Sequence, residues 1–518
     1  MKIGIDIGGT NTHVVLVSDQ GRLVVAAKHM TTSDILTGVY CAVKSLFERT
    51  SISPAEIKGI FIGTTQVINA LFEEKLIAKT ALIRIGNKRS KITPALNWPP
   101  ALKSFLKEVF YLESNNCYNG TSSQVMDYHN ELELICQKIA NDSVEAICIV
   151  GTYSPMFEAE ELHVKNEIKK RIPNISVTTS YQLGSIGYIE RENTSLLNTL
   201  LSKVSREILD ELASIFSSLS LTCPFWLTQN NGSLMTVQEA IEFPVLTIAS
   251  GVTNSLRGAA IISSLKDMIA VDIGGSKIYA GRVRNGQLKE VTMSTNFFGI
   301  DASLVIPEFI TLPFGGGSLT SIENGQVNIL PSISTDIEKE GLAWGGESWT
   351  VSDSFLKLFP LTFYDQKIDV SRLECLPFNE CNEVVRYVMS QLKSVLDLLQ
   401  DHESELPVVL VGGGSPLFNE RLFGKYKRVM NPSGYPISGA IGACFAPVSG
   451  VIDKVYWLNN RSKEEIIEEA VSTCKNIVLE KGANPSSIQV SYVEEYPFAY
   501  LRGEILRVKT KATGELIL

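Results

Sequence analysis

Two short segments of this sequence combine an aspartate, a pair of glycines and a hydroxyl residue in a pattern that suits phosphate binding. The first runs from Ile3 to Thr12 and contains Asp6, Gly8, Gly9, Thr10, Asn11 and Thr12. Glycines at a turn leave backbone N–H groups open to a ligand, and the threonine and asparagine side chains add donors. Asp6 stands where a carboxylate would contact a hydrated divalent cation or orient a water molecule. Taken alone, such a segment more often forms an ordinary tight turn.

The second segment, Met268 to Val283, repeats the same order of residue types. A strand-like run leads to Asp272, and the turn that follows contains Gly274, Gly275, Ser276 and Lys277. Alternating apolar residues before each aspartate and β-branched residues after each turn predict a strand on both sides of the turn. Turn signals at 19–21 and 285–286 then predict a third strand after each copy. The chain is therefore expected to contain a duplicated three-stranded meander.

Two such hairpins facing each other would present two sets of backbone donors and two carboxylates, Asp6 and Asp272, to one polyphosphate. This arrangement resembles the actin-like ATPase fold shared by actin, hexokinases and heat-shock ATPases. The resemblance implies an α/β protein with duplicated lobes around a central cleft. It also implies that ATP lies between the two hairpins.

Two glycine triplets each follow a predicted strand. The first comprises Gly315, Gly316 and Gly317, and the second comprises Gly412, Gly413 and Gly414 with Ser415 after it. Three consecutive glycines cost conformational entropy unless the backbone must pass close to another group. By analogy with actin-like ATPases, the second triplet and Ser415 are expected against the adenosine. The first is expected to line the cleft near the phosphates or the substrate.

Three polar clusters stand at predicted helix starts, and each has a structural and a functional interpretation. Thr64, Thr65 and Asn69 follow a short strand, where free N–H groups and the helix dipole favour an anion, although the threonines would also suit a helix cap. Glu190 and Arg191 form either a charged helix start or a polar cluster at a domain junction. Asp353 either caps a helix or faces the cleft. All six are candidate substrate or cleft residues.

The composition restricts the class of protein. A chain of 518 residues with 44% hydrophobic and 20% charged residues is expected to be globular and to form three or four domains. The formal net charge of -9 argues against a nucleic-acid partner. No apolar run approaches a membrane span, no signal peptide is evident, and the nine cysteines show no C-x-x-C spacing. We expect a cytoplasmic protein without a membrane partner, a zinc site or a disulfide framework.

The order of predicted elements suggests three parts. Residues 1–185 form a first lobe, residues 186–446 form a second lobe with the second hairpin and the adenosine loop, and residues 447–518 form a small α/β appendage. Residues 87–130 are expected to be an irregular surface excursion with some β content, and Val245 to Ala249 a strand. The appendage has no catalytic cluster, so we expect it to serve interaction or dimerisation, and we expect the protein to be an oligomer.

The chain resembles the hydantoinase A/oxoprolinase family from Met1 to about Ala446. The resemblance rests on the order of motifs that begin at Asp6, Gly63, Glu190, Gly251, Asp272, Gly315, Thr350 and Gly412. It implies ATP-dependent opening of a cyclic amide such as a hydantoin, 5-oxoproline or a lactam, often with a second hydantoinase-type subunit. It further implies that ATP phosphorylates the amide oxygen, with Asp6 and Asp272 contacting Mg²⁺ through water or acting as the base.

The sequence departs from the family pattern at three places. His13 and Tyr279 stand where the two hairpin motifs normally continue to an aspartate, and Ile310 stands in place of a histidine before the first glycine triplet. Three hypotheses follow: a cyclic-amide hydrolase subunit, a small-molecule kinase of the same fold, and a non-catalytic nucleotide-binding partner subunit. The fold alone does not choose between them.

Overall fold

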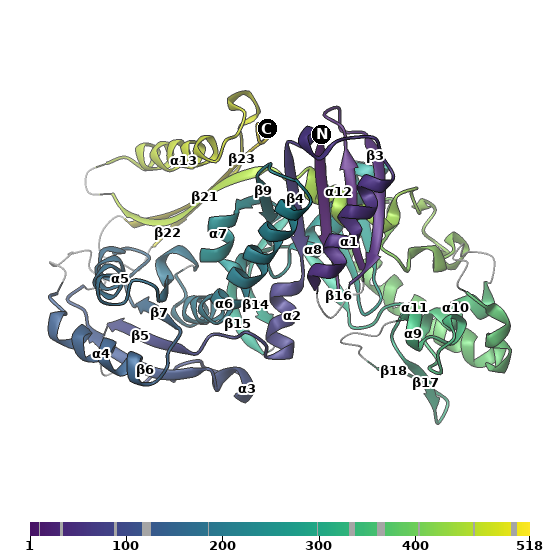
Figure 1. Cartoon of the computed structure of the whole chain (residues 1–518), viewed down its shortest axis with the longest axis horizontal. Helices are drawn as coiled ribbons and strands as arrows, with labels where there is room; N and C mark the ends of the chain where they lie inside the picture. Colours follow the sequence, from purple (N-terminus) through teal and green to yellow (C-terminus); the bar gives the residue numbers. More distant parts are fainter. Residues whose placement is uncertain are drawn as a thin grey trace.

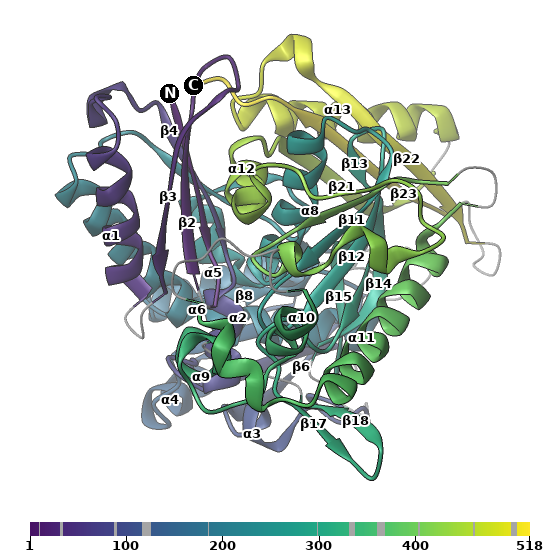
Figure 2. The ribbon, with the colours of Figure 1, turned by 90° about the vertical axis from the view of Figure 1, so that its right-hand side faces the viewer.

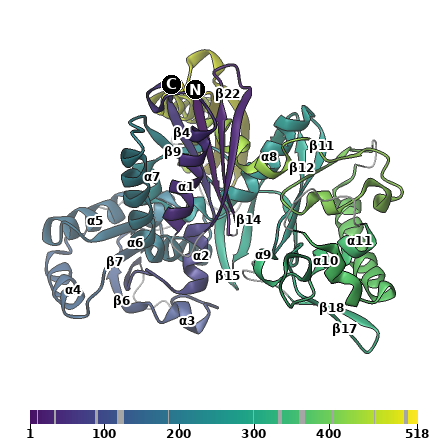
Figure 3. The same ribbon diagram turned by 45° about the vertical axis from the view of Figure 1, so that its right-hand side comes forward.

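The structure is a computed structural model of the whole chain in two lobes (Figure 1). It describes residues 1–9, 11–31, 35–86, 91–116, 126–184, 186–297, 299–330, 337–359, 368–401, 405–458, 461–498 and 505–518. Figure 3 shows the lobes side by side, with α4 to α6 on one side and α9 to α11 on the other. The predicted class, an α/β protein with duplicated actin-like lobes, is confirmed.

The first lobe is built on a nine-stranded sheet in the order β22-β23-β21-β10-β9-β4-β1-β2-β3. Its central strands are β1 (Lys2–Ile7), β2 (Asn11–Val17), β3 (Leu23–Met30), β4 (Gly59–Thr64), β9 (Phe225–Thr228) and β10 (Leu234–Thr236). The predicted meander is present, and β4 runs parallel to β1. Ile3, Ile5 and Ile7 are fully buried in a core shared with α1 (Ile35–Glu48). Because strand side chains alternate, Asp6 faces the opposite side of the sheet.

The second lobe repeats this plan around β11. Its sheet has the order β13-β12-β11-β19-β20, with β16 also paired to β12. The strands are β11 (Met268–Ile273), β12 (Ile278–Arg284), β13 (Gln287–Leu288), β16 (Phe309–Leu312), β19 (Val408–Val411) and β20 (Val429–Met430). The predicted third strand is only the two-residue β13, because the chain then leaves as the hairpin β14 (Glu290–Phe297) and β15 (Ile300–Pro307) and returns as β16.

Two helices, α8 (Ser250–Ser263) and α12 (Ser438–Cys444), cross between the lobes (Figure 2). A Cβ atom at Gly258 would lie 1.9 Å from the carbonyl oxygen of Ser438, and one at Gly442 would lie 1.9 Å from that of Asn254. Only glycine permits this approach, so the two positions set the distance between the helices. Within the described part of the chain, the stretch Pro244–Ser263 has the length and composition of a membrane span, but 67% of its window is buried inside the protein.

A four-stranded parallel sheet in the order β6-β5-β7-β8 forms a separate layer of the first lobe. Its strands are β5 (Thr80–Gly86), β6 (Leu106–Glu113), β7 (Ala146–Gly151) and β8 (Ser176–Thr179), and its helices are α3 (Pro100–Lys103), α4 (His129–Asn141), α5 (Ala159–Arg171) and the long α6 (Tyr188–Ser218). Strand β6 supplies the β content expected within 87–130, a stretch of which residues 87–90 and 117–125 lie outside the described part of the chain. Leu112 is buried and β6 pairs with β5, although polar residues interrupt its apolar pattern.

The C-terminal module contains β21 (Val448–Trp457), α13 (Lys463–Glu480), β22 (Gln489–Pro497) and β23 (Ile505–Gly514). It has the predicted α/β elements, and it continues the first sheet through the single parallel pairing of Leu234 with Val448. A contact between Lys511 and Glu290 also joins it to β14. The division at 185, 186 and 447 stays a prediction, and the first sheet takes in β9 and β10 beyond residue 185.

The remaining elements are shorter, apart from α11. They are α2 (Gln66–Glu73), α7 (Val237–Glu242), β17 (Thr320–Glu323), β18 (Gln326–Ile329), α9 (Ile337–Glu340), α10 (Val351–Leu358) and α11 (Phe378–Leu399). The predicted strand at 245–249 is wrong. Pro244–Thr247 forms a 3-10 turn instead, because Pro244 favours a turn and Val245 packs into the core with α6.

The ion pair between Arg84 and Glu192 joins β5 to α6 and is almost fully buried, with side-chain exposures of 4% and 3%. Changing Glu192 to Gln leaves the guanidinium buried without its counter-charge. We expect the free energy of unfolding to fall by about 3–5 kcal/mol in urea titrations. The matched control is Glu383→Gln, which breaks the exposed pair with Arg386 and should cost at most about 0.5 kcal/mol. Equal losses in both variants would contradict the prediction.

Candidate active site

Asp6 and Asp272 stand at corresponding positions near the carboxyl ends of β1 and β11. Burial, together with the negative charge of Asp272, raises the pKa of Asp6 to about 7. Burial also raises the pKa of Asp272, although a hydrogen bond from Ser255 partly offsets the effect. The contacts link the two groups: Asp6 packs against Gly439 of α12, and the adjacent Ser438 lies 3.1 Å from Ser255, which bonds Asp272. The structure therefore brings the two predicted carboxylates to one place between the lobes.

Glycines make room for both carboxylates. A Cβ atom at Gly439, on α12, would lie 2.1 Å from Oδ2 of Asp6. A Cβ atom at Gly412 would lie 2.2 Å from Oδ1 of Asp272, and Gly412 has a φ angle of +86°. Any larger residue at these positions would displace a carboxylate. The glycine of the predicted adenosine loop thus also positions Asp272.

The two hairpin tips have the same backbone geometry. The N–H of Gly8 donates to the carbonyl of Asn11 at 3.1 Å, and the N–H of Gly274 donates to that of Lys277 at 3.0 Å. No atom lies within 4 Å of a Cβ built on Gly9, and Oδ1 of Asn11 is buried without a partner among the described residues. Thr10 lies outside the described residues. The first tip therefore offers open space and an unpartnered polar atom.

Thr12 supports the first tip from behind. It is fully buried, and its hydroxyl lies 3.3 Å from the hydroxyl of Thr31, which donates to the carbonyl of Gly8 at 3.0 Å. In the second tip, Gly275, Ser276 and Lys277 occupy the turn between β11 and β12, and Lys277 contributes its carbonyl to that turn. Their assignment to phosphate binding stays a prediction.

The first glycine triplet braces the second hairpin tip. The N–H groups of Gly316 and Gly317 donate to the carbonyls of Gly274 and Gly275 at 2.9 and 2.7 Å, and that of Gly315 donates to Ser318 at 2.9 Å. These N–H groups are therefore already bonded within the chain. These contacts favour support of the turn over direct phosphate binding, and a place for the triplet in the cleft near the phosphates or the substrate stays a prediction.

The second triplet leaves more free space. No atom lies within 4 Å of a Cβ built on Gly413, whereas Gly414 donates its N–H to the carbonyl of Ile273 at 2.9 Å. The Ser415 hydroxyl is buried and donates to Oδ1 of Asn431 at 3.3 Å. The loop thus extends from the end of β19 past the end of β11, and only Gly413 has an open side.

Thr64, the last residue of β4, and Thr65, which follows it, join that strand to neighbouring segments. Thr65 directs both its N–H and its hydroxyl toward the carbonyl of Ile7, at 3.2 and 3.3 Å, and makes no side-chain cap to α2. The carbonyl of Thr64 accepts a hydrogen bond from Ser250 at the start of α8. Asn69 lies in the first turn of α2 and donates its N–H to the carbonyl of Thr65. Of the two interpretations, the helix cap is not supported.

Glu190, Arg191 and Asp353 contact neighbouring residues of the fold. Arg191 is fully buried and donates to the hydroxyl of Ser180 and to the carbonyls of Ile186 and Gly151. Glu190 folds back over Gly187 at the start of α6. Asp353 is fully buried in the capping box of α10 and accepts from the backbone N–H groups of Ala343 and Thr350. For all three, these contacts favour the structural interpretation over a cleft role.

Sequence reasoning missed several polar residues on the two crossing helices. Ser255 lies 3.1 Å from Ser438, hydroxyl to hydroxyl, and bonds Asp272. Asn254 donates to Thr228 at 2.7 Å, while its Oδ1 is buried without a partner among the described residues. The available signal was the run of small residues in both segments, which predicts close helix packing but not polar contacts with the carboxylates.

Two of the three departures from the family pattern lie directly beside the carboxylates. In the strand register, His13 pairs with Asp6 and Tyr279 pairs with Asp272. Cross-strand partners share one face of a sheet, so each substituted side chain neighbours the carboxylate of its own hairpin. Burial, and then the positive charge of Lys28, lowers the pKa of His13 to about 4, which leaves the imidazole neutral at pH 7. Burial and Asp272 raise the pKa of Tyr279 to about 12.

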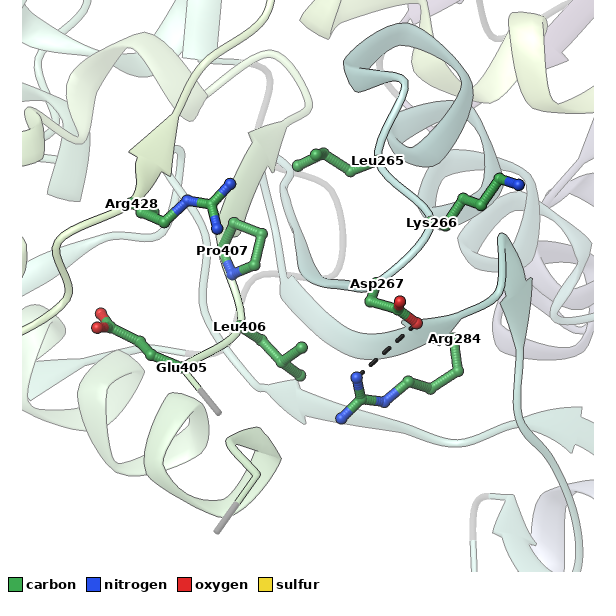
Figure 4. Close-up of a pocket in the computed structure, with 8 residues that line it drawn as sticks. All are labelled: Leu265, Lys266, Asp267, Arg284, Glu405, Leu406, Pro407 and Arg428. Atoms are coloured by element: carbon green, nitrogen blue, oxygen red, sulfur yellow. Dashed lines mark ion pairs between the residues drawn. The ribbon is translucent and has the colours of Figure 1, made fainter. Parts of the chain in front are cut away.

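A hollow of about 400 Å³ lies elsewhere in the second lobe, away from the two carboxylates (Figure 4). Asp267 and Pro407, which line it, immediately precede β11 and β19, and Arg428 precedes β20. Asp272 stands near the other end of β11, so this hollow is not the site defined by the carboxylates. Among the described residues, no group of three or more His, Cys, Asp or Glu side chains could hold a metal ion.

The two-lobed fold and the paired hairpins define the class of protein, an actin-like ATPase fold. Two family models match the chain: the hydantoinase/oxoprolinase N-terminal region over residues 2–172 and hydantoinase/oxoprolinase over residues 191–363. The chain belongs to the hydantoinase/oxoprolinase family.

Two curated relatives align with 69% of this chain. The caprolactamase subunit alpha of Pseudomonas jessenii is 22% identical over 378 residues, and an uncharacterized protein of Methanocaldococcus jannaschii is 22% identical over 392 residues. The alignments cover 54% and 56% of those proteins, so the chain spans about half the length of the curated relatives it matches.

Two solved structures share the fold over the whole chain. The ATP-dependent caprolactamase from Pseudomonas jessenii has a TM-score of 0.77 at 16% identity, and a nucleotide-free acetone carboxylase has a TM-score of 0.73 at 15% identity. In each case the match covers 100% of this chain and 88% of the other. Both likenesses establish the fold.

The raised pKa of Asp6 makes stability depend on pH. The folded pKa is about 7 against an ordinary value of 3.8, so the folded protein binds this proton more tightly than the unfolded chain does. The resulting stabilisation is fully present below about pH 3.8 and is lost as the pH rises through 7. Relative to Asp6→Asn, we expect the free energy of unfolding of the wild-type chain to fall by about 3 kcal/mol between pH 4.5 and 8.

The measurement is a urea titration at each pH without nucleotide or Mg²⁺. Asp142→Asn, at an exposed position after α4, is the matched control and should follow the wild-type curve. Parallel curves for the wild type and Asp6→Asn would show that Asp6 titrates as an ordinary aspartate.

Proposed function

We propose that this chain is a subunit of an ATP-dependent hydrolase that opens a cyclic amide, such as a hydantoin, oxoproline or a lactam, through a phosphorylated intermediate. The observation that carries the proposal is the convergence of Asp6 and Asp272 in a member of the hydantoinase/oxoprolinase family. The name of the Pseudomonas jessenii relative, a caprolactamase subunit, supports a lactam-type substrate and a partner subunit.

The residues fit ATP with Mg²⁺. Two partly buried carboxylates that repel each other would be stabilised by a hydrated cation between them, which is the role we propose for Asp6 and Asp272. Open space beside Gly9 and Gly413 and the unpartnered Oδ1 of Asn11 leave room for a polar ligand at the hairpin tips. Gly8, Thr10, Gly274, Gly275, Ser276 and Lys277 complete the proposed phosphate site.

The proposed reaction proceeds in balanced steps. The amide oxygen bonds to the γ-phosphorus of ATP as the bond to the leaving ADP breaks. Water then adds to the activated carbon, the ring carbon–nitrogen bond breaks as the nitrogen takes a proton, and a second water releases phosphate and the open-chain acid. A carboxyl group with a pKa near 7, as Asp6 has, is suited to accept or return a proton at neutral pH.

A second candidate function is a non-catalytic nucleotide-binding partner subunit. The observation that favours it is the placement of His13 and Tyr279 beside the two aspartates, where the family pattern carries further carboxylates. Fewer carboxylates weaken a cation site, whereas backbone N–H groups still bind phosphate. Under either candidate, we propose a cytoplasmic protein that assembles with a second hydantoinase-type subunit into an oligomer.

The test measures ADP release with Mg²⁺ and a panel of hydantoins, 5-oxoproline and lactams. We expect one ring compound to stimulate turnover, and we expect Asp6→Asn and Asp272→Asn to lower that rate at least about 100-fold. Asp142→Asn is the control with an unchanged rate. A stable phosphorylated product would identify a kinase instead, and stimulation only by a protein partner would exclude an enzyme that acts alone.

A further inference from the structure

A second hollow, of about 240 Å³, lies at the carboxyl edge of the four-stranded parallel sheet. Its walls include residues from the ends of β5 and β6, the residue after β7 and the first residue of α6. The strand order is β6-β5-β7-β8, so the chain leaves β5 on one side and later returns on the other. Open α/β sheets bind ligands outside the carboxyl ends of their strands, where the strand order reverses. The hollow occupies that place.

The walls are mainly apolar and aromatic. Leu112 is buried, while Tyr111 and Ile92 are 38% and 40% exposed. Tyr188 is held by two cations, because Arg84 and Arg191 each lie 5.7 Å from its ring centre. A fixed ring on one wall and a half-exposed ring on another suit a flat ligand that stacks on aromatic faces.

Thr152 contributes a hydroxyl to the walls of this hollow, where Tyr111 and Tyr188 also carry one. The N–H of Thr152 donates to the carbonyl of Ile85 at 2.8 Å, which fixes Thr152 beside the end of β5. A Cβ atom at Gly86 would lie 2.2 Å from the Thr152 hydroxyl, so only glycine lets that hydroxyl take its position. A ligand carbonyl or N–H group is the natural partner of such a hydroxyl.

The positive charge of Arg84, which lines the hollow, is already neutralised by Glu192. Arg84 donates from Nε and Nη2 to Glu192, at 2.7 Å each, and from Nη1 to the carbonyl of Ile92 at 2.6 Å. Its guanidinium therefore has a counter-charge and hydrogen bonds from all three nitrogens. A charged ligand would enter a largely apolar hollow without a counter-ion, which is costly. The ligand that fits is uncharged.

We propose that this pocket binds an uncharged, flat ring amide, at a site separate from the one that holds Asp6 and Asp272. The pocket shares no residue with the groups described around the carboxylates, and it belongs to a different sheet. The choice of an amide ring rests on the proposed function, whereas the uncharged and aromatic character follows from the walls. The pocket would hold the ring compound without nucleotide.

The test uses 5-phenylhydantoin as the probe and the full chain without nucleotide. Calorimetry and saturation-transfer NMR should show saturable binding. Tyr111→Ala removes a stacking wall at a half-exposed position and should weaken binding about tenfold, and Thr152→Val, which keeps the side-chain shape, should weaken it several-fold. Tyr40→Ala, at a tyrosine that is 36% exposed on α1, is the matched control and should leave the affinity unchanged. Thermal unfolding confirms that each variant is folded.

The second part of the test compares binding of a charged analogue. The ring-opened carbamoyl acid of the same compound carries a carboxylate and should bind at least tenfold more weakly. The proposal is overturned if 5-phenylhydantoin does not bind, if Tyr111→Ala and Thr152→Val match Tyr40→Ala, or if the acid binds equally well. Turnover is measured separately, so loss of this binding with intact ring-stimulated ADP release would refute the pocket alone. Binding without any such turnover would refute the proposed function alone.

Discussion

The crossing of α8 and α12 is the constraint on which the rest of the site depends. Gly258 and Gly442 allow the helices to touch through their backbones, and this contact fixes how the two lobes meet. The same helices also position the chemistry, because α12 brings Gly439 to Asp6 and α8 brings Ser255 to Asp272. One packing interaction therefore sets both the relative position of the two lobes and the relative position of the two carboxylates. A change in the crossing angle would alter both together.

The architecture was largely predictable because the two hairpins and the strand and helix periodicities carry strong local signals. Asp6 and Asp272 were found from the repeated motif, and the structure brings them together. The register that places His13 and Tyr279 beside them follows from hairpins with short turns, so it was also available from sequence. Other features depended on contacts between distant segments. The role of Gly439, and the use of the Gly316 and Gly317 N–H groups within the chain, cannot be derived from local patterns.

The polar residues proposed from sequence as site residues show the same limit of local patterns. Arg191 and Asp353 are of residue types common in active sites, yet each is fully buried and has hydrogen-bond partners from its own framework. A buried charged group needs such partners to be tolerated, so polarity at a helix start does not distinguish a ligand contact from a structural one. Strand β6 shows the limit from the other side. Prolines and asparagines predicted an irregular segment with some β content, but they did not locate the strand, which pairing with β5 and burial of Leu112 define.

The long sequence separation between the first hairpin and α12 has a consequence for synthesis on the ribosome. The hairpin that carries Asp6 emerges long before α12, and β4 is available to pair with it soon afterwards. Gly439, however, emerges only after more than four hundred further residues have been translated. Domains fold in the order in which their contacts become available. The nascent segment that carries Asp6 therefore has to persist without Gly439 beside its carboxylate, and the complete site forms only after α12 has been translated.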